Sequence, residues 1–134
     1  MILSVVSMLL AGASPAELQV DVGKIQLASL PPAKRVERRL PTPEMVDEVE
    51  RILASGSCKL RGQTSKGFDI DIPYAALVEP DGSVQRVVVG ELGCSELESY
   101  AGLVVLELGR MGDFRANATP KARWYGDQLN FNLR

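Results

Sequence analysis

The sequence predicts an α+β domain in which two helices pack on one face of a three-stranded antiparallel sheet, in the order helix, strand, strand, helix, strand. Three observations support this fold class. Residues 68–78 alternate between apolar and other side chains with the period of two that a half-buried strand needs. Residues 42–56 and 95–111 carry apolar stripes at helical spacing. Residues 128–133 alternate again, which favours a closing strand with one polar face.

Residues 67–90 form the predicted hairpin, and the core side of its first strand carries Phe68, Ile70, Ile72, Tyr74, Ala76 and Val78. Pro80-Asp81-Gly82-Ser83 supplies the turn, because Asp bonds nearby backbone and Gly adopts a positive φ without steric cost. Val84 is out of phase with the later valines of the return strand, which predicts a bulge or a strong twist near Arg86. Pro73 lacks an N–H, so we expect an unpaired edge or a bulge beside it.

The first helix is predicted to have Thr42 as its N-cap and to stop at Gly56. Its inner stripe consists of Met45, Val46, Val49, Ile52 and Leu53. The second helix is predicted to start at Ser95, with Glu98 completing a capping box. Its inner stripe consists of Leu97, Tyr100, Ala101, Val104, Leu108 and Met111. Gly102 lowers the helix propensity, so we expect another chain segment to pass close to it.

Two segments precede the predicted domain, which covers residues 42–134. Residues 1–16 are typical of the end of a secretory signal peptide, because an apolar run too short to span a bilayer leads to the small residues Ala11-Gly12-Ala13. Ser14-Pro15-Ala16 is a second cleavage option, and a strand or helix buried in the domain is the alternative. Residues 17–41 are proline-rich and basic, and we expect a linker or arm there.

The chain has two cysteines, and export would place them in an oxidising compartment. Cys58 follows the first predicted helix and Cys94 precedes the second. Two helices on the same face of a sheet bring these positions together, so we expect a disulfide bond, with two separate buried thiols as the alternative. Closing a loop of roughly 37 residues stabilises a domain by about 4 kcal/mol in the chain-entropy model.

Composition argues against several classes of function. The formal net charge of −2 disfavours a nucleic acid as the main partner, because phosphate binding needs a positive surplus. The chain contains no histidine, which removes the commonest general base and a favoured zinc ligand. Asp69 and Asp71 form an i, i+2 pair of carboxylates, but such a pair on a strand face usually serves solubility. We therefore expect no enzyme, no metal site and no cofactor.

Several stretches of the domain carry a resemblance to a known family: Leu77–Val84 with Val87 and Val89, Leu97, Leu108–Arg115 and Leu129–Leu133. Through them, the chain from Pro41 onward resembles the C-terminal domain of TonB-type energy transducers. The resemblance implies a non-catalytic protein exposed to the periplasm that binds short segments of outer-membrane receptors by strand addition. Nothing in the sequence resembles the membrane anchor or the proline-rich spacer of that family, so we expect binding, with a role in TonB-dependent transport as the alternative.

The predicted binding site is the exposed edge of the last strand, where strand addition would place an extended partner. Its outward-facing residues are Gln128, Asn130 and Asn132, and Trp124 and Tyr125 are candidate anchors. The alternative is that both aromatic residues complete the core and the polar residues keep the edge soluble. Pairing of two such edges in a homodimer is an intermediate case. A second, weaker candidate is contact of an anionic envelope polymer with Lys34, Arg35, Arg38 and Arg39, which otherwise belong to a solvated linker.

Overall fold

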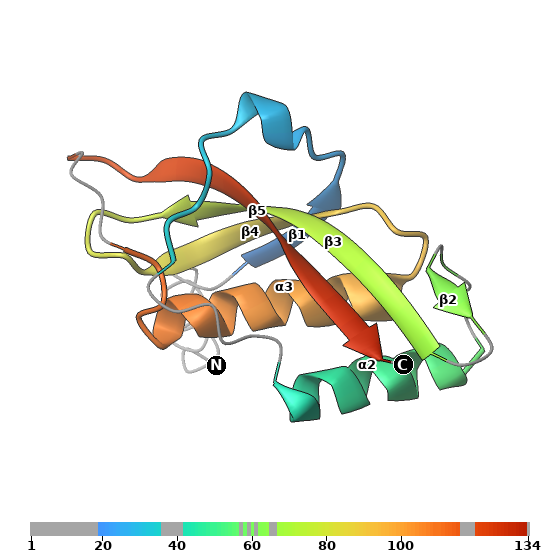
Figure 1. Ribbon diagram of the computed structural model, residues 1–134. Coiled ribbons are helices and arrows are strands. Elements are labelled where there is room, and N and C mark those ends of the chain that lie inside the picture. Colours follow the sequence, from blue (N-terminus) through green and yellow to red (C-terminus); the bar gives the residue numbers. More distant parts are fainter. Residues whose placement is uncertain are drawn as a thin grey trace, which may run out of the picture.

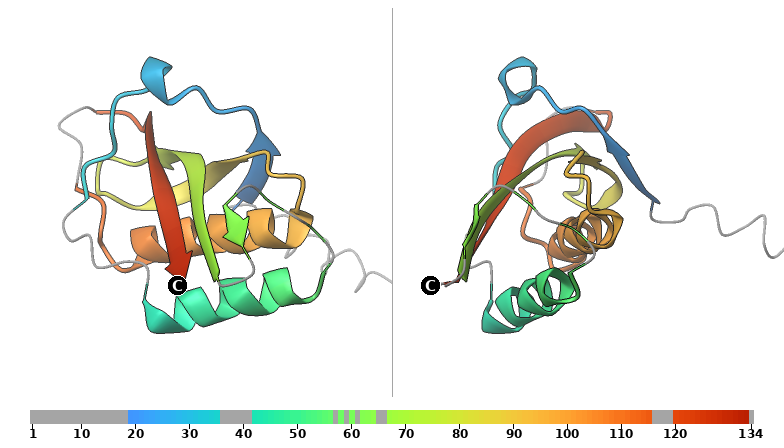
Figure 2. Two further views of the ribbon diagram at one scale, coloured as in Figure 1. Left: turned by 45° about the vertical axis from the view of Figure 1, so that its right-hand side comes forward. Right: turned by 90° about the vertical axis from the view of Figure 1, so that its right-hand side faces the viewer.

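Two helices cover one face of a curved five-stranded sheet, as Figure 1 and Figure 2 show. The computed structural model describes residues 19–35, 42–56, 58, 60, 62–64, 67–115 and 120–133. The predicted signal peptide therefore lies outside the described residues. The elements follow the order β1 (Gln19–Gly23), the 3-10 turn η2 (Leu27–Ser29), α2 (Pro43–Ala54), β2 (Gln63–Thr64), β3 (Gly67–Val78), β4 (Val84–Gly90), α3 (Ser95–Arg110) and β5 (Arg123–Leu133).

The long strand β3 organises the sheet. β5 pairs antiparallel with β3 along residues 68–78, so it occupies one edge of β3 completely. The other edge is shared, because β4 pairs with residues 74–78 and the short β2 pairs with residues 67–68. β1 extends the sheet beyond β4, with Gln19–Gly23 in parallel register with Arg86–Gly90.

The predicted α+β class with two helices is confirmed, but the prediction of three antiparallel strands is not. The sheet has five strands and is mixed, because β1 runs parallel to β4. Residues 19–35 of the expected linker or arm belong to the domain, since they form β1, η2 and an isolated bridge between Pro32 and Gly126. Their apolar side chains and their backbone pairing provide the order that composition alone did not indicate.

The core lies between the helices and the sheet. Figure 2 shows α2 and α3 on the same side of the sheet, where α3 packs mainly on β4 and α2 on β5, and their buried side chains join one core cluster. The largest fully buried side chains are Tyr74, Phe131, Ile52, Ile72, Leu97 and Leu108. α2 begins as predicted, with the Thr42 hydroxyl accepting a hydrogen bond from the N–H of Met45 at 3.2 Å. Arg51 joins the two helices by donating to Glu48 and to Glu96, and its hydrogen bond lowers the pKa of the exposed Glu48 carboxyl.

The hairpin follows its local sequence signals. The Asp81 carboxylate accepts hydrogen bonds from the N–H and the hydroxyl of Ser83, which lower the pKa of Asp81, and Gly82 has a φ of 91°. The predicted bulge is confirmed, since the register shifts between Leu77 and Val78 opposite the start of β4. Pro73 also fits its expected place, because β2 and β4 leave the edge of β3 beside it unpaired within the described part of the chain.

Gly102 explains how β1 packs against the sheet and α3. A Cβ at Gly102 would lie 2.8 Å from Cγ2 of Val20 and closer still to Cγ1. Only glycine therefore lets the Val20 side chain approach α3 this closely. The sequence indicated such an approach without identifying the neighbour. The docking of β1 therefore depends on the absence of one methyl group on α3.

Replacing Gly102 by alanine is expected to lower the free energy of unfolding by about 2 kcal/mol, because the added methyl forces β1 away from α3 and overpacking typically costs 1–3 kcal/mol. In an unconstrained helix the same change stabilises by nearly 1 kcal/mol. Urea unfolding measures the difference. In a Val20→Ala background the Gly102→Ala change should become neutral or stabilising; equal losses in both backgrounds would show that Val20 is not the cause.

Candidate functional site

The outer edge of β5, which is the edge turned away from β3, is the candidate site. Its N-terminal half is covered. The N–H of Gly126 donates to the carbonyl of Pro31 and the N–H of Ala33 donates to the carbonyl of Gly126, each at 2.9 Å. We call residues 24–33 the strap, because they cross the back face of the sheet, the face turned away from the helices, and then pass around this edge (Figure 1, Figure 2).

The bonds of Gly126 also define which backbone groups of β5 point outward. Backbone direction alternates along a strand, and the register with β3 is continuous from residue 123 to residue 133, so Gln128, Asn130 and Asn132 share the orientation of Gly126. The N–H of Gln128 donates to the carboxylate of Asp127 at 2.8 Å. Within the described residues, the outward backbone groups of Asn130 and Asn132 have no hydrogen-bond partner. The C-terminal half of the edge is therefore open.

The side chains of the three predicted polar residues lie on the back face of the sheet, and only their backbone faces the edge. The Asn130 amide donates to the carboxylates of Asp69 and Asp71, both at 2.7 Å, across the strand pair. This arrangement places one amide between two like charges and offsets their repulsion. The two carboxylates thus share a structural partner in the Asn130 amide.

Trp124 and Tyr125 do not line the open part of the edge. They are neighbours in one strand, so they point to opposite faces. Tyr125 packs against the core, with the Arg123 guanidinium 5.9 Å from its ring centroid. Trp124 lies on the back face beneath the Arg86 guanidinium, which is 5.8 Å from its ring centroid. Both precede the crossing of the strap at Gly126, so the structure separates these candidate anchors from Asn130 and Asn132.

Arg35 does not belong to a solvated basic patch. Its Nε donates to Asp113 at 2.6 Å, and the two side chains are only 4% and 10% exposed. The N–H of Arg115 donates to the carbonyl of Lys34 beside this ion pair. Lys34 itself is exposed, whereas Arg38 and Arg39 lie outside the described residues. The Arg35 guanidinium is buried against a carboxylate, so Arg35 is not available for the predicted contact with a polymer.

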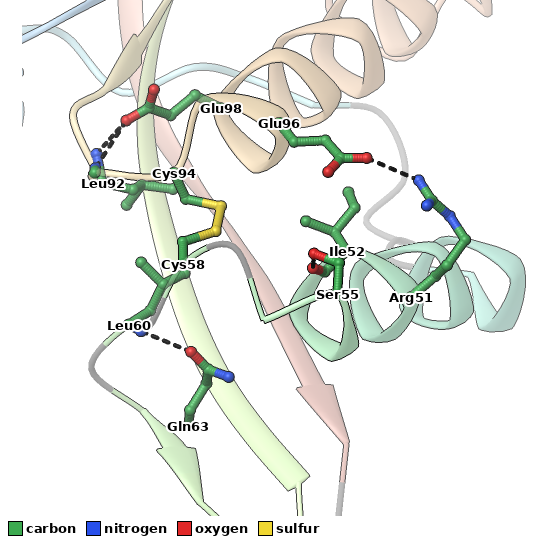
Figure 3. The surroundings of a disulfide bond; sticks show 11 residues. Arg51, Ile52, Ser55, Cys58, Leu60, Gln63, Leu92, Cys94, Glu96 and Glu98 are labelled. Carbon is green, nitrogen blue, oxygen red and sulfur yellow. Dashed lines mark hydrogen bonds and ion pairs between the residues drawn. A yellow bond between two sulfur atoms is a disulfide. The ribbon is translucent and has the colours of Figure 1, made fainter.

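The predicted disulfide between Cys58 and Cys94 is present, with Cα atoms 5.4 Å apart (Figure 3). Cys94 is the N-cap of α3, so the predicted capping box at Ser95 does not form. The buried carboxylate of Glu98 instead accepts hydrogen bonds from the N–H groups of Leu92 and Gly93, which fixes the preceding loop. A disulfide indicates a compartment outside the cytoplasm. Among the helices that the structure describes, none is long and apolar enough to cross a membrane.

The described residues contain no cluster of three or more His, Cys, Asp or Glu side chains with the geometry of a metal site. The structure also reveals a feature that the sequence reasoning missed, namely the strap over the back face. A signal for it was present. Ala75, Leu77 and Val88 are apolar in the strand phase that points away from the helices, which indicates a second covered surface.

Comparisons of the chain with protein-family models, with curated proteins and with solved structures found no match.

Proposed function

We propose that this protein is a non-catalytic binding module of the periplasm that recognises a short extended segment of an envelope protein by strand addition at the outer edge of β5. The observation that carries the proposal is the open edge at Asn130 and Asn132. Unpaired edge groups are a template for another strand, and natural proteins usually cover or blunt them. The strap adds support, because Pro31 and Ala33 already pair with the same edge in an extended conformation.

The extent of the open edge limits the partner. It begins beyond Gly126, where the strap crosses, and it offers the N–H groups of Asn130 and Asn132 together with the carbonyls of Gln128, Asn130 and Asn132. Each backbone hydrogen bond contributes about 1 kcal/mol net, before the entropic cost of ordering the partner is subtracted. We therefore expect a segment of about five residues that binds weakly, with a dissociation constant near 1 mM, a free energy of about −4 kcal/mol.

The class of partner rests on two further arguments. The antiparallel unit β4–β3–β5 with α2 and α3 agrees with the element order of the TonB-type C-terminal domain, which supports a segment of an outer-membrane receptor as the partner. The disulfide supports an oxidising compartment, in agreement with export by a signal peptide at residues 1–16. A role in TonB-dependent transport would be the cellular context of such binding.

Asn130→Pro is expected to weaken binding of receptor peptides about tenfold relative to Asn130→Ala. Both variants lose the side-chain hydrogen bonds to Asp69 and Asp71. Only proline removes the outward N–H and places its ring where the partner strand must approach. Proline is tolerated here because the N–H of Asn130 faces away from β3 and carries no ladder bond. Titration of synthetic peptides from the periplasm-facing segments of an outer-membrane receptor measures the ratio.

Amide hydrogen exchange locates the contact. Bound peptide should slow exchange at Asn132 in the Asn130→Ala variant and leave exchange at Leu129 and Phe131 unchanged, since these already bond to β3. Equal affinities of the proline and alanine variants would rule out strand addition at β5. If the chain alone protects Asn132 in a concentration-dependent manner and sediments as a dimer, the edge pairs with a second copy and the proposed partner is wrong.

A further inference from the structure

The back face of the sheet is apolar over the region that the strap covers. A row of directly paired residues crosses the strands there, from Val88 in β4 through Ala75 in β3 to Gly126 in β5, and the strap closes the row at Pro32. Ala75 is only 6% exposed although it points away from the helices. In a two-layer domain this back face would contact solvent. Here the strap buries part of it and forms a second, smaller apolar layer.

The small residues of this row leave space under the strap. Gly126 allows Leu27 and Leu30 to lie directly on β5, since a Cβ there would be 3.0 Å from a methyl group of each. Beside this contact lies an open, surface-exposed cavity of about 360 Å³, with an apolar part formed by Ile25, Leu30, Ala75, Val88 and Trp124 and a polar part formed by Lys24, Gln26 and Ser29. Its volume falls at the lower end of the range of small-molecule pockets, about 300–1,000 Å³.

The described lining of the cavity carries a single charged residue, while the carboxylate of Asp21, which pairs with Val88 in the sheet, faces Arg86. Lys24 is the only charged residue that lines it, and no carboxylate does so among the described residues. Lys24 forms no ion pair within the part of the chain that the structure describes. Arg86 stands over the ring of Trp124, and its guanidinium lies 3.9 Å from the carboxylate of Asp21. A partly apolar cavity whose lining includes an unpaired lysine is complementary to an amphipathic anion.

We propose that this cavity binds a small carboxylate with an aromatic or short aliphatic body, which lies against Trp124 and directs its carboxylate to Lys24. The apolar walls supply most of the affinity by removing the ligand body from water. The ammonium supplies selectivity for the anion over a neutral or cationic analogue. The site is separate from the strand-addition edge, because the strap crosses β5 at Gly126 between the two.

Intrinsic fluorescence reads out this cavity directly, because Trp124 is the only tryptophan of the chain. We use 4-phenylbutyrate as the probe, with 4-phenylbutan-1-ol and 4-phenylbutylamine as its neutral and cationic analogues. Titration of 4-phenylbutyrate should change the Trp124 emission to saturation, with a dissociation constant about tenfold lower than that of the alcohol, since a charged hydrogen bond contributes at least that factor. The amine should bind most weakly.

Two variants and a control test the assignment. Lys24→Met should abolish the preference for the acid over the alcohol and leave the affinity for the alcohol unchanged. Ala75→Ile should fill the cavity and remove binding of both compounds, with circular dichroism confirming that the variant is folded. Lys34→Met is the matched control, because Lys34 is exposed just beyond the strap and does not line the cavity. It should behave like the unchanged protein.

Absence of a saturable change with 4-phenylbutyrate would overturn the proposal. Equal affinities for the acid, the alcohol and the amine would overturn it too, since the cavity would then lack selectivity for an anion. Binding that survives in folded Ala75→Ile would place the compound elsewhere. Asn130→Pro should leave the titration unchanged, so failure at the β5 edge and failure at this cavity are distinguishable.

Discussion

Reduction of the disulfide between Cys58 and Cys94 is expected to lower the free energy of unfolding by about 2–4 kcal/mol. The bond joins residues 36 positions apart, and the chain-entropy model assigns about 4 kcal/mol to a loop of that length. It ties the segment that follows α2 to the N-cap of α3, and Cys94 is 2% exposed. The free energy of unfolding of a small domain is only about 5–15 kcal/mol, so this loss is a large fraction of its stability. Urea unfolding with and without reductant measures it.

The Cys58→Ala/Cys94→Ala double variant is the control, because the chain has no other cysteine and its stability should not respond to reductant. The reduced protein should keep its helical circular dichroism in the absence of urea, since Glu98 still holds the loop before α3 through Leu92 and Gly93. Identical unfolding midpoints of the oxidised and reduced protein would contradict the prediction. A mass increase of two hydrogens on reduction verifies that the bond was present.

The elements that could be predicted from the sequence are those with local signals. Thr42 and Pro43 define a helix start within one turn, and Asp81 with Gly82 defines a reversal within four residues. The alternation in β3 and β5 indicated which side chains enter the core, and Phe131 and Ile72 are fully buried as expected. Such signals depend only on residues close together in the sequence, so they can be interpreted without knowledge of the fold.

β1 could not be predicted in the same way, because its stability comes from contacts distant in sequence. Five residues with two valines carry a weak strand signal, and no hairpin turn connects β1 to β4. The strap likewise depends on distant contacts with Gly126 and Ala75, and Arg35 just after it contacts Asp113. Composition suggested a linker there because proline and basic residues dominate, while the few apolar residues fit a surface that only the assembled sheet provides.

The candidate site was predictable in type and only partly in extent. The polar phase of the last strand identified Gln128, Asn130 and Asn132 as outward residues, but alternation cannot tell whether an edge is open. The path of the strap decides that, because it closes the edge at Gly126 and separates Trp124 from the open half. The ion pair of Arg35 with Asp113 follows this crossing by two residues, so we expect the length of the open edge to depend on it.

Asp113→Ala is expected to lower the free energy of unfolding by about 3 kcal/mol. The change removes the carboxylate that faces the guanidinium of Arg35, and breaking a buried ion pair by removing one partner typically costs 3–5 kcal/mol. The loss should also loosen the strap, because Lys34 and Arg35 attach it to the segment after α3. Amide exchange at Gly126, whose N–H bonds to Pro31, should therefore accelerate more than exchange at Leu129.

The double variant Arg35→Met/Asp113→Leu separates charge from packing, because apolar residues of similar size can replace a buried ion pair at little cost. It should lose less than half as much stability as Asp113→Ala and should keep Gly126 protected. A cost of less than 1 kcal/mol for Asp113→Ala, or equal costs for both variants, would show that this ion pair does not hold the strap. With the strap loosened in Asp113→Ala, receptor peptides longer than about five residues should gain affinity at β5, since the edge then continues past Gly126.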